Sequence, residues 1–180
     1  MNNHTLIVQS SRLIIRQLSL EDAPFTLSLL NEPSWIEFIG DKNVHSIADA
    51  EHYLNDGPLA MYARHGLGMY LVAAKDSNRP VGMCGLLKRD TLQDVDLGLA
   101  FLPEYWGAGY ASEAARAVLD YGRKQLQLAR IVAITLPGNT ACIALLERLG
   151  FAHEENVSFE PDNEVLRLYG LDTASLRSDS

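Results

Sequence analysis

The first third of the chain carries a hydrophobic pattern that predicts one strand followed by interrupted helices. Residues 12–18 mix apolar and polar side chains as a half-buried strand does. Residues 19–30 begin with a serine and, three residues later, an aspartate, which resembles a capping box that opens a helix. The same pairing opens a second helix at residue 46, and the Gly57-Pro58 dipeptide interrupts it.

The middle of the chain predicts three strands in quick succession. The apolar segments lie at residues 68–74, 81–88 and 92–102, and the turn-forming sequences DSNRP and RDT separate them. Because the connections are this short, we expect the three strands to form an antiparallel meander.

The last third alternates between helical and strand patterns. Small and apolar residues recur at helical spacing over 112–126, and a continuous apolar run at 130–136 is typical of a buried central strand. An apolar stripe over 139–149 predicts another helix, which Gly150 ends. Two closing strands follow, one from residue 151 onward and one at 164–171.

This order of elements indicates an α/β or α+β fold, in which helices cover both faces of one sheet. A chain of 180 residues is long enough for one well-buried core and short for two, so we expect a single domain over residues 1–180. The polar end of the chain, from about residue 172, is expected to be frayed.

The composition limits the partners and the compartment. A formal net charge of −8 argues against nucleic acid and suits a cationic or amine partner better. Cys84 and Cys142, far apart in the chain, fit a reducing compartment such as the cytoplasm. Neither they nor the five histidines show a metal-ligand spacing, so no metal is expected. No apolar run is long enough to cross a bilayer, so no membrane association is expected.

The sequence EYWGAGYASEAA places Gly107 and Gly109 between an apolar segment and an alanine-rich one. It predicts a strand, a glycine turn and a helix whose first N–H groups have no partner inside the helix, an arrangement that binds anions. A P-loop would need a lysine soon after the glycines, and a dinucleotide-binding turn would need an acidic residue after the next strand; the chain has neither. A turn that needs glycine only for its backbone geometry is the alternative.

The longer segment LAFLPEYWGAGYASEAA, followed by NTACIALLERLGF, resembles the two signature motifs of the GCN5-related N-acetyltransferases, and it is similar to the branch that contains the ribosomal-protein alanine N-acetyltransferases. Trp106, Gly109 and Ala111 occupy the defining places of the first motif, with the tryptophan as a departure from the general pattern. The resemblance implies a mixed, mostly antiparallel twisted sheet of about seven strands, acetyl-CoA as co-substrate and a primary amine as acceptor.

The resemblance also implies where the coenzyme lies. In the family, backbone N–H groups of the glycine turn hold the pyrophosphate of coenzyme A, and the preceding strand pairs with its pantetheine arm. An asparagine at the start of the second motif lies near the coenzyme, although it can equally serve as a plain helix N-cap. The expected coenzyme contacts in this chain are Leu99, Phe101, Trp106, Gly107, Ala108, Gly109, Tyr110, Ala111, Ser112 and Asn139.

For the chemistry, the resemblance points to Asp96 as the base that takes the proton of the amine, directly or through water. Strand alternation puts Asp96 on the same side as Asp94, and a solvent-exposed carboxylate at the sheet edge is the alternative. Cys142 and Tyr169 are candidates for protonating the departing thiolate. Core packing is the favoured role for the cysteine and the usual role for such a tyrosine.

The acceptor is expected to lie against Trp35, Glu37 and Phe38, and His45 could join them. The similar branch implies a protein N-terminal α-amine, whereas polyamines, amino acids and other small amines also fit the chemistry. Direct transfer in a ternary complex is expected. A non-catalytic acyl-CoA-binding sensor or interaction module is the alternative, because Asp96 and Cys142 depart from the commoner residues of the family.

Overall fold

The computed structural model describes residues 4–176 and shows an eight-stranded sheet with the order β1-β2-β3-β4-β5-β6-β8-β7. All neighbouring strands are antiparallel except β5 and β6, which are parallel. The mixed, mostly antiparallel sheet expected from the resemblance is thus confirmed. The strands are β1 (Leu6–Gln9), β2 (Leu13–Gln17), β3 (Met69–Ala74), β4 (Pro80–Leu87), β5 (Asp96–Phe101), β6 (Arg130–Thr135), β7 (Ala152–Val157) and β8 (Leu166–Asp172).

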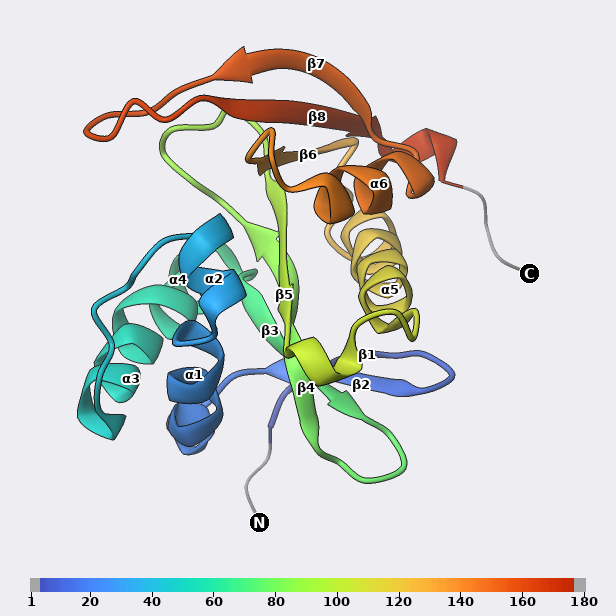
Figure 1. The fold of residues 1–180 in the computed structure, drawn as a ribbon. Helices are drawn as coiled ribbons and strands as arrows, with labels where there is room; N and C mark the ends of the chain where they lie inside the picture. Colours follow the sequence, from blue (N-terminus) through green and yellow to red (C-terminus); the bar gives the residue numbers. More distant parts are fainter. Residues whose placement is uncertain (1–3, 177–180) are drawn as a thin grey trace.

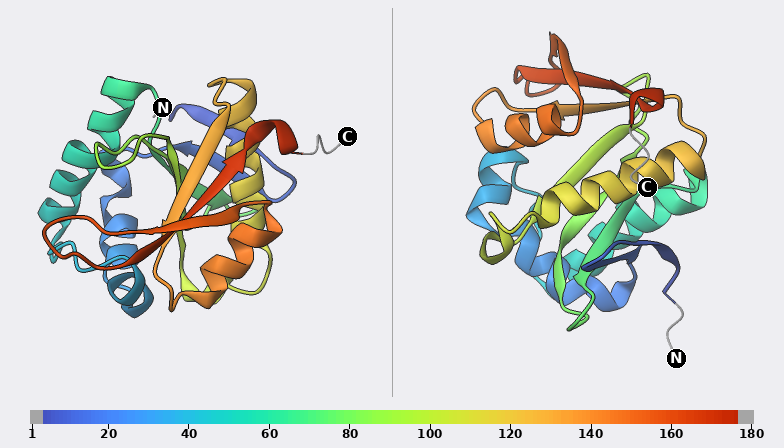
Figure 2. Two further views of the ribbon diagram at one scale, coloured as in Figure 1. Left: turned by 90° about the horizontal axis from the view of Figure 1, so that it is seen from above. Right: turned by 90° about the vertical axis from the view of Figure 1, so that its right-hand side faces the viewer.

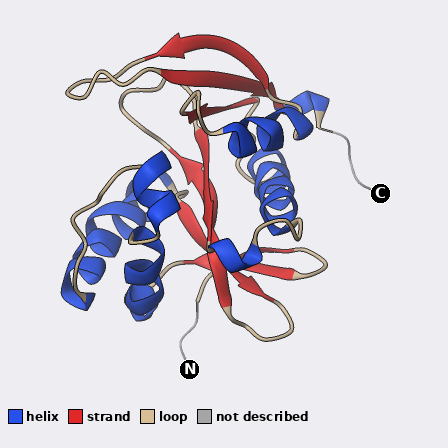
Figure 3. Ribbon diagram, in the orientation of Figure 1, coloured by secondary structure: helices blue, strands red, loops and turns tan. Residues whose placement is uncertain are grey.

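Helices cover both faces of this sheet, as predicted. The group α1–α4 lies on one side and α5 and α6 lie on the other, with the strands between them (Figures 1 and 3). The right-hand view of Figure 2 places α5 between the β1–β2 hairpin and the crossing strands β6, β8 and β7. The helices are α1 (Ala23–Leu30), α2 (Pro33–Phe38), α3 (Ile47–Leu54), α4 (Ala60–His65), α5 (Tyr110–Lys124) and α6 (Thr140–Arg148).

Each face of the sheet has its own hydrophobic core, because side chains alternate along the strands. On β3, Tyr70 and Val72 belong to the cluster beneath α5 and α6, whereas Leu71 and Ala73 belong to the cluster beneath α1 and α3. Both helix starts predicted from capping pairs are present, and the Ser46 hydroxyl accepts the expected bond from a backbone N–H in the first turn of α3.

The sheet opens between β5 and β6. Strands β4 and β5 are paired along their whole length, but β5 and β6 share only the pair Asp96↔Val132. Figure 1 shows β5 running along the middle of the molecule while β6, β8 and β7 cross above its end. Most of β5 therefore has no strand on its β6 side.

Two strand predictions and the prediction for the tail need correction. The edge strand β1 was not predicted, because its four residues are short and partly exposed and carry no clear alternation. Strand β5 begins at Asp96 and not at residue 92, because the carbonyls of Leu92 and Gln93 accept hydrogen bonds from the Lys88 ammonium in a loop.

The tail does not fray at residue 172. Strand β8 extends through Asp172 and a 3₁₀ turn follows at Thr173–Ser175. The Thr173 hydroxyl donates to the Leu128 carbonyl at 2.6 Å, which holds the turn against the loop before β6. The rest of the predicted tail lies outside the described residues.

Replacing Gly85 with alanine is expected to destabilise the fold by about 3 kcal/mol through overpacking. A Cβ there would lie 2.6 Å from the Cα of Met69 and closer still to the Gly68 carbonyl, and backbone cannot move aside as a flexible side chain can. Gly57→Ala is the matched control, because a Cβ at Gly57 meets nothing within 4 Å. Urea unfolding curves would measure both; equal midpoints for the two variants would contradict this account.

Candidate active site

One large cleft, of about 1190 Å³, follows the opening between β5 and β6. Its walls come from β5, the glycine turn, the end of β6, the start of α6, the α2 helix and the loop between β7 and β8. Segments from both halves of the chain therefore meet around one space. Most of the residues singled out in the sequence contribute to its lining.

The open edge of β5 presents unpaired backbone groups to this cleft. Successive residues of a strand point their N–H and C=O groups to opposite sides. The Leu102 N–H donates to Val81 on the β4 side, and the Val95 carbonyl accepts from Val132 of β6. By this alternation Leu97, Leu99 and Phe101 direct their backbone groups toward the opening, which includes the two residues predicted to pair with the pantetheine arm.

Trp106 contacts the C-terminal end of the open β5 edge. Its indole Nε1 donates to the Phe101 carbonyl at 2.9 Å, while 56% of the residue stays exposed. The Phe101 carbonyl therefore has a partner within the chain. The backbone of Leu99, one step further into the cleft, is left for a ligand.

The glycine turn has the backbone geometry that the sequence predicts. Gly107 and Gly109 have φ values of 73° and 81°, in the left-handed region that favours glycine, and Gly109 is the N-cap of α5. Trp106 N–H donates to Pro103, and Glu113 N–H donates to Gly109. Within residues 4–176, the N–H groups of residues 107–112 have no hydrogen-bond acceptor. Unpaired donors at the start of a helix form an anion site.

Asp96 is buried at the point where β5 and β6 part. It is 1% exposed, so the alternative of a solvent-exposed edge carboxylate is wrong. The Arg89 Nε–H lies 3.0 and 3.2 Å from its two oxygens, and both residues line the cleft. Burial raises the pKa of Asp96 above the ordinary aspartate value, although the charge and hydrogen bond of Arg89 oppose this.

The start of α6 forms the wall opposite β5. The Asn139 side chain accepts a hydrogen bond from the Cys142 N–H at 3.1 Å, so the N-cap role is confirmed, and both residues line the cleft. Cys142 is half-buried, not fully buried as expected for a core residue. Burial raises the pKa of its thiol. Cys84, in contrast, is fully buried.

Other predicted residues lie outside the cleft. Tyr169 is 1% exposed and belongs to the hydrophobic core under α6, against the ring of His153. Its packing role, the alternative considered above, is the one its burial supports. Glu37 and His45 do not line the cleft, whereas Trp35 and Phe38 do.

Two arginines that the sequence analysis does not include, Arg89 and Arg12, contact residues of the site. Arg89 lies in the RDT sequence, which predicts a turn between strands. Arg12 lies about a hundred residues from the glycine turn and yet donates a hydrogen bond to the Ala108 carbonyl at 2.9 Å. No local pattern marks either contact, because each depends on how distant segments pack.

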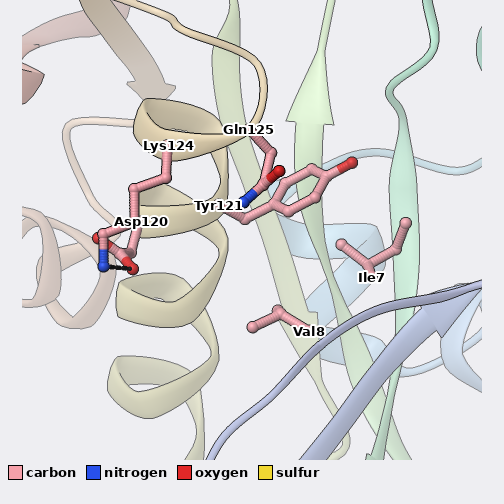
Figure 4. Close-up of a pocket in the computed structure, with 6 residues that line it drawn as sticks. All are labelled: Ile7, Val8, Asp120, Tyr121, Lys124 and Gln125. Atoms are coloured by element: carbon pink, nitrogen blue, oxygen red, sulfur yellow. Dashed lines mark ion pairs between the residues drawn. The ribbon is translucent and has the colours of Figure 1, made fainter.

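A second hollow, of about 260 Å³, lies between β1 and the end of α5 (Figure 4). Its lining includes Ile7, Val8 and Tyr121, and the ion pair between Lys124 and Asp120 lies at its side. It is much smaller than the cleft and contains none of the predicted site residues.

The part of the chain that the structure describes offers neither a cluster of metal ligands nor a membrane-spanning helix. Residues 4–176 contain no group of three or more histidine, cysteine, aspartate or glutamate side chains placed to hold a metal ion. Within the same residues no helix is both long and apolar enough to cross a bilayer.

The chain is similar to known proteins in sequence and in fold. Residues 12–152 match the family described as "Acetyltransferase (GNAT) domain". The chain is 30% identical over 149 residues to "Uncharacterized N-acetyltransferase p20" of Bacillus licheniformis, covering 81% of this chain and 82% of that protein. It is 32% identical over 95 residues to the uncharacterized protein YkkB of Bacillus subtilis, a match that spans 52% of this chain and only 55% of that protein.

Solved structures share the fold. The complex of RimL, a "Ribosomal L7/L12 alpha-N-protein acetyltransferase", with coenzyme A superimposes with a TM-score of 0.80 at 17% identity, covering 93% of this chain and 97% of that one. At this identity the similarity concerns the arrangement of the elements.

Proposed function

The chain belongs to the GNAT acetyltransferase family, and from this premise we propose that it transfers the acetyl group of acetyl-CoA directly to a primary amine. The observation that carries the proposal is that one cleft joins two complementary features. The glycine turn offers unpaired N–H groups for a pyrophosphate, and the open edge of β5 offers backbone groups for an amide-containing arm.

The proposed coenzyme position follows from these two features. The pyrophosphate lies against the N–H groups of residues 107–112, the pantetheine arm runs along Leu99, and Asn139 faces it from α6. The thioester then reaches the cleft near the start of β5, close to Asp96. Binding both substrates in this alignment supplies a large part of the rate by proximity.

The proposed reaction needs one base and no covalent enzyme intermediate. The neutral amine nitrogen attacks the acetyl carbon, a C–N bond forms, the C–S bond breaks, and the sulfur departs as a thiolate. Asp96 accepts the proton that the nitrogen loses, directly or through water, and the thiolate takes up a proton to leave as coenzyme A thiol. A backbone N–H of β5 near Leu99 stabilises the oxyanion.

We assign Cys142 to the cleft wall and not to the proton transfer. Burial raises the pKa of its thiol, so the thiol releases its proton less readily than a free one. Cys142→Ala is expected to keep kcat within about threefold of the parent and to lose about 1 kcal/mol of stability from the smaller side chain. Cys84→Ala, at a fully buried cysteine, is the control for packing alone. A kcat collapse in Cys142→Ala at unchanged stability would show that the thiol takes part in the chemistry.

For the acceptor we propose a protein N-terminal α-amine. Trp35 and Phe38 of α2 line the cleft, and so do three acidic residues of the β7–β8 loop, Glu160, Asp162 and Glu164. Such a lining favours a cationic segment that carries the amine. RimL, which is described as an α-N-protein acetyltransferase and has the same fold, supports this choice.

The test is release of coenzyme A thiol with a panel of amines. A peptide with a free N-terminus is expected to be acetylated, and the same peptide with a blocked N-terminus is the control that leaves only its lysine amines. Turnover of a polyamine or an amino acid alone would refute the proposed acceptor.

The Asp96–Arg89 ion pair is the observation in favour of a non-catalytic acyl-CoA-binding module. Saturable acetyl-CoA binding without turnover of any amine would establish that function instead.

A further inference from the structure

We propose that Arg12, held by Glu113, is a positioning residue that fixes the glycine turn from behind in the conformation that binds the coenzyme. This inference rests on the proposed function, because it assigns a role at the same coenzyme site. It concerns the turn between β1 and β2, which is hydrogen-bonded to Glu113 near the start of α5.

Glu113 anchors this turn to α5. One of its carboxylate oxygens accepts hydrogen bonds from the Ser10 and Ser11 hydroxyls and from the Arg12 N–H, at 2.7, 3.1 and 2.9 Å. The other accepts from Arg12 Nε at 2.7 Å. Burial opposes ionisation of Glu113, but these hydrogen bonds outweigh it and lower its pKa to about 2. Glu113 is therefore charged throughout the neutral pH range.

Anchored in this way, the guanidinium of Arg12 holds a single peptide of the glycine turn. Its Nη1 donates to the Ala108 carbonyl at 2.9 Å, and its Cζ lies 4.5 Å from the centre of the Tyr110 ring. A trans peptide is planar, so its C=O and N–H groups point in opposite directions. Holding the Ala108 carbonyl on the Arg12 side therefore turns the Gly109 N–H to the other side.

That other side is the cleft. Gly107 and Gly109 line it, whereas Ala108 and Arg12 do not. The turn thus has a front that faces the proposed pyrophosphate and a back that Arg12 holds. Two glycines with positive φ make this segment intrinsically free to adopt other conformations, so an external contact is needed to select one.

The expected consequence is a loss of coenzyme affinity when the contact is removed. If the binding conformation of the turn falls to one tenth of the population, the apparent Kd rises about tenfold. Arg12→Gln is expected to raise the Kd of coenzyme A, measured by calorimetry, and the KM of acetyl-CoA by about tenfold. The kcat is expected to stay within about twofold, because Arg12 does not face the reacting atoms.

Two further variants separate positioning from direct attraction between Arg12 and the phosphates. Arg12→Lys keeps the charge but cannot bind Glu113 and Ala108 at the same time. If Arg12 positions the turn, this variant should lose about as much coenzyme affinity as Arg12→Gln. If Arg12 attracts the phosphates directly, its affinity should stay near that of the parent. Glu113→Gln sets an amide N–H₂ against Arg12 Nε. Positioning predicts weaker binding, whereas attraction predicts equal or tighter binding because a negative charge is removed. This variant keeps the side-chain volume and carries the test alone if Arg12→Gln does not fold.

Asp120→Asn is the matched control, because it removes another ion-paired carboxylate of α5 far from the glycine turn. It is expected to leave the Kd unchanged. Gly107→Glu, which places a carboxylate in the cleft itself, tests the site. Normal affinity in the Arg12 and Glu113 variants, with binding lost in Gly107→Glu, would refute the positioning role and leave the coenzyme site intact. Normal affinity in all of them would refute the site as well.

Discussion

Gly107→Glu is expected to abolish the thermal stabilisation that acetyl-CoA gives the parent protein. A ligand that binds only the native state adds about 2.7 kcal/mol at a hundred times its Kd, which corresponds to a rise of roughly 5–10 °C in a domain of this size. The parent is expected to show this rise, and the variant almost none. The negative charge would lie where the pyrophosphate must bind, in a turn that is partly shielded from water.

The structure makes Gly107 the better position for this test than Gly109. A Cβ at Gly109 would lie 3.3 Å from Arg12 Nη2 and would disturb the contact behind the turn, whereas a Cβ at Gly107 meets nothing within 4 Å. Gly66→Glu is the matched control, because Gly66 has a φ of 69° against 73° for Gly107, also meets nothing within 4 Å, and lies outside the cleft.

Gly107→Glu and Gly66→Glu each carry about 1–2 kcal/mol of backbone strain, because each puts a non-glycine residue at positive φ. Without ligand, the melting temperatures of the two variants should therefore fall equally. Only Gly107→Glu should lose the response to acetyl-CoA. A full response in that variant would remove the glycine turn from the coenzyme site. Loss of the response in Gly66→Glu as well would attribute the effect to strain.

Asp96→Asn is expected to lower kcat by about 10²- to 10⁴-fold while the Kd of acetyl-CoA stays near that of the parent. The amide keeps the shape of the carboxylate and an oxygen that can accept from Arg89, but it cannot take the proton of the amine. Asp94→Asn is the control. Asp94 comes two residues earlier in the same segment and is ion-paired with Arg130, but it does not line the cleft.

The pH dependence supplies a second measurement on the same variant. A base must be ionised to act, so kcat/KM of the parent should rise with pH through the pKa of Asp96. Burial raises this pKa above that of an ordinary aspartate, against the opposing effect of Arg89. Asp96→Asn should lose this limb of the profile, while the limb that reports deprotonation of the amine remains. A variant profile with the shape and height of the parent profile would exclude Asp96 from the mechanism.

Much of the fold could be predicted because its signals are local. Caps, glycines and hydrophobic spacing act over a few residues. The sequence therefore predicts the meander of β3, β4 and β5 and the starts of α3 and α6. The glycine turn was found for the same reason, since two residues of positive φ next to a helix start leave a mark in the sequence itself. The weak, exposed strand β1 leaves no such mark and was missed.

The roles proposed for Asp96 and Arg12 leave less trace in the sequence, since burial and charge pairing depend on which segments meet. Alternation placed Asp96 on one side of its strand, but only the packed structure buries it and pairs it with Arg89. In the same way, only the packed structure shows that the Tyr169 side chain lies in the hydrophobic core and not in the cleft.

By itself, therefore, the sequence determined the order of most elements, the glycine turn before α5 and, through its motifs, the family. The tertiary structure decided that β5 and β6 part after the single pair Asp96↔Val132, which opens the cleft, and that Arg12 reaches the back of a turn about a hundred residues away. The physical reason is the distance along the chain over which each interaction acts. Backbone propensities are fixed by neighbours along the chain, whereas a cleft and the charges around it are set by contacts that exist only once distant segments have packed together.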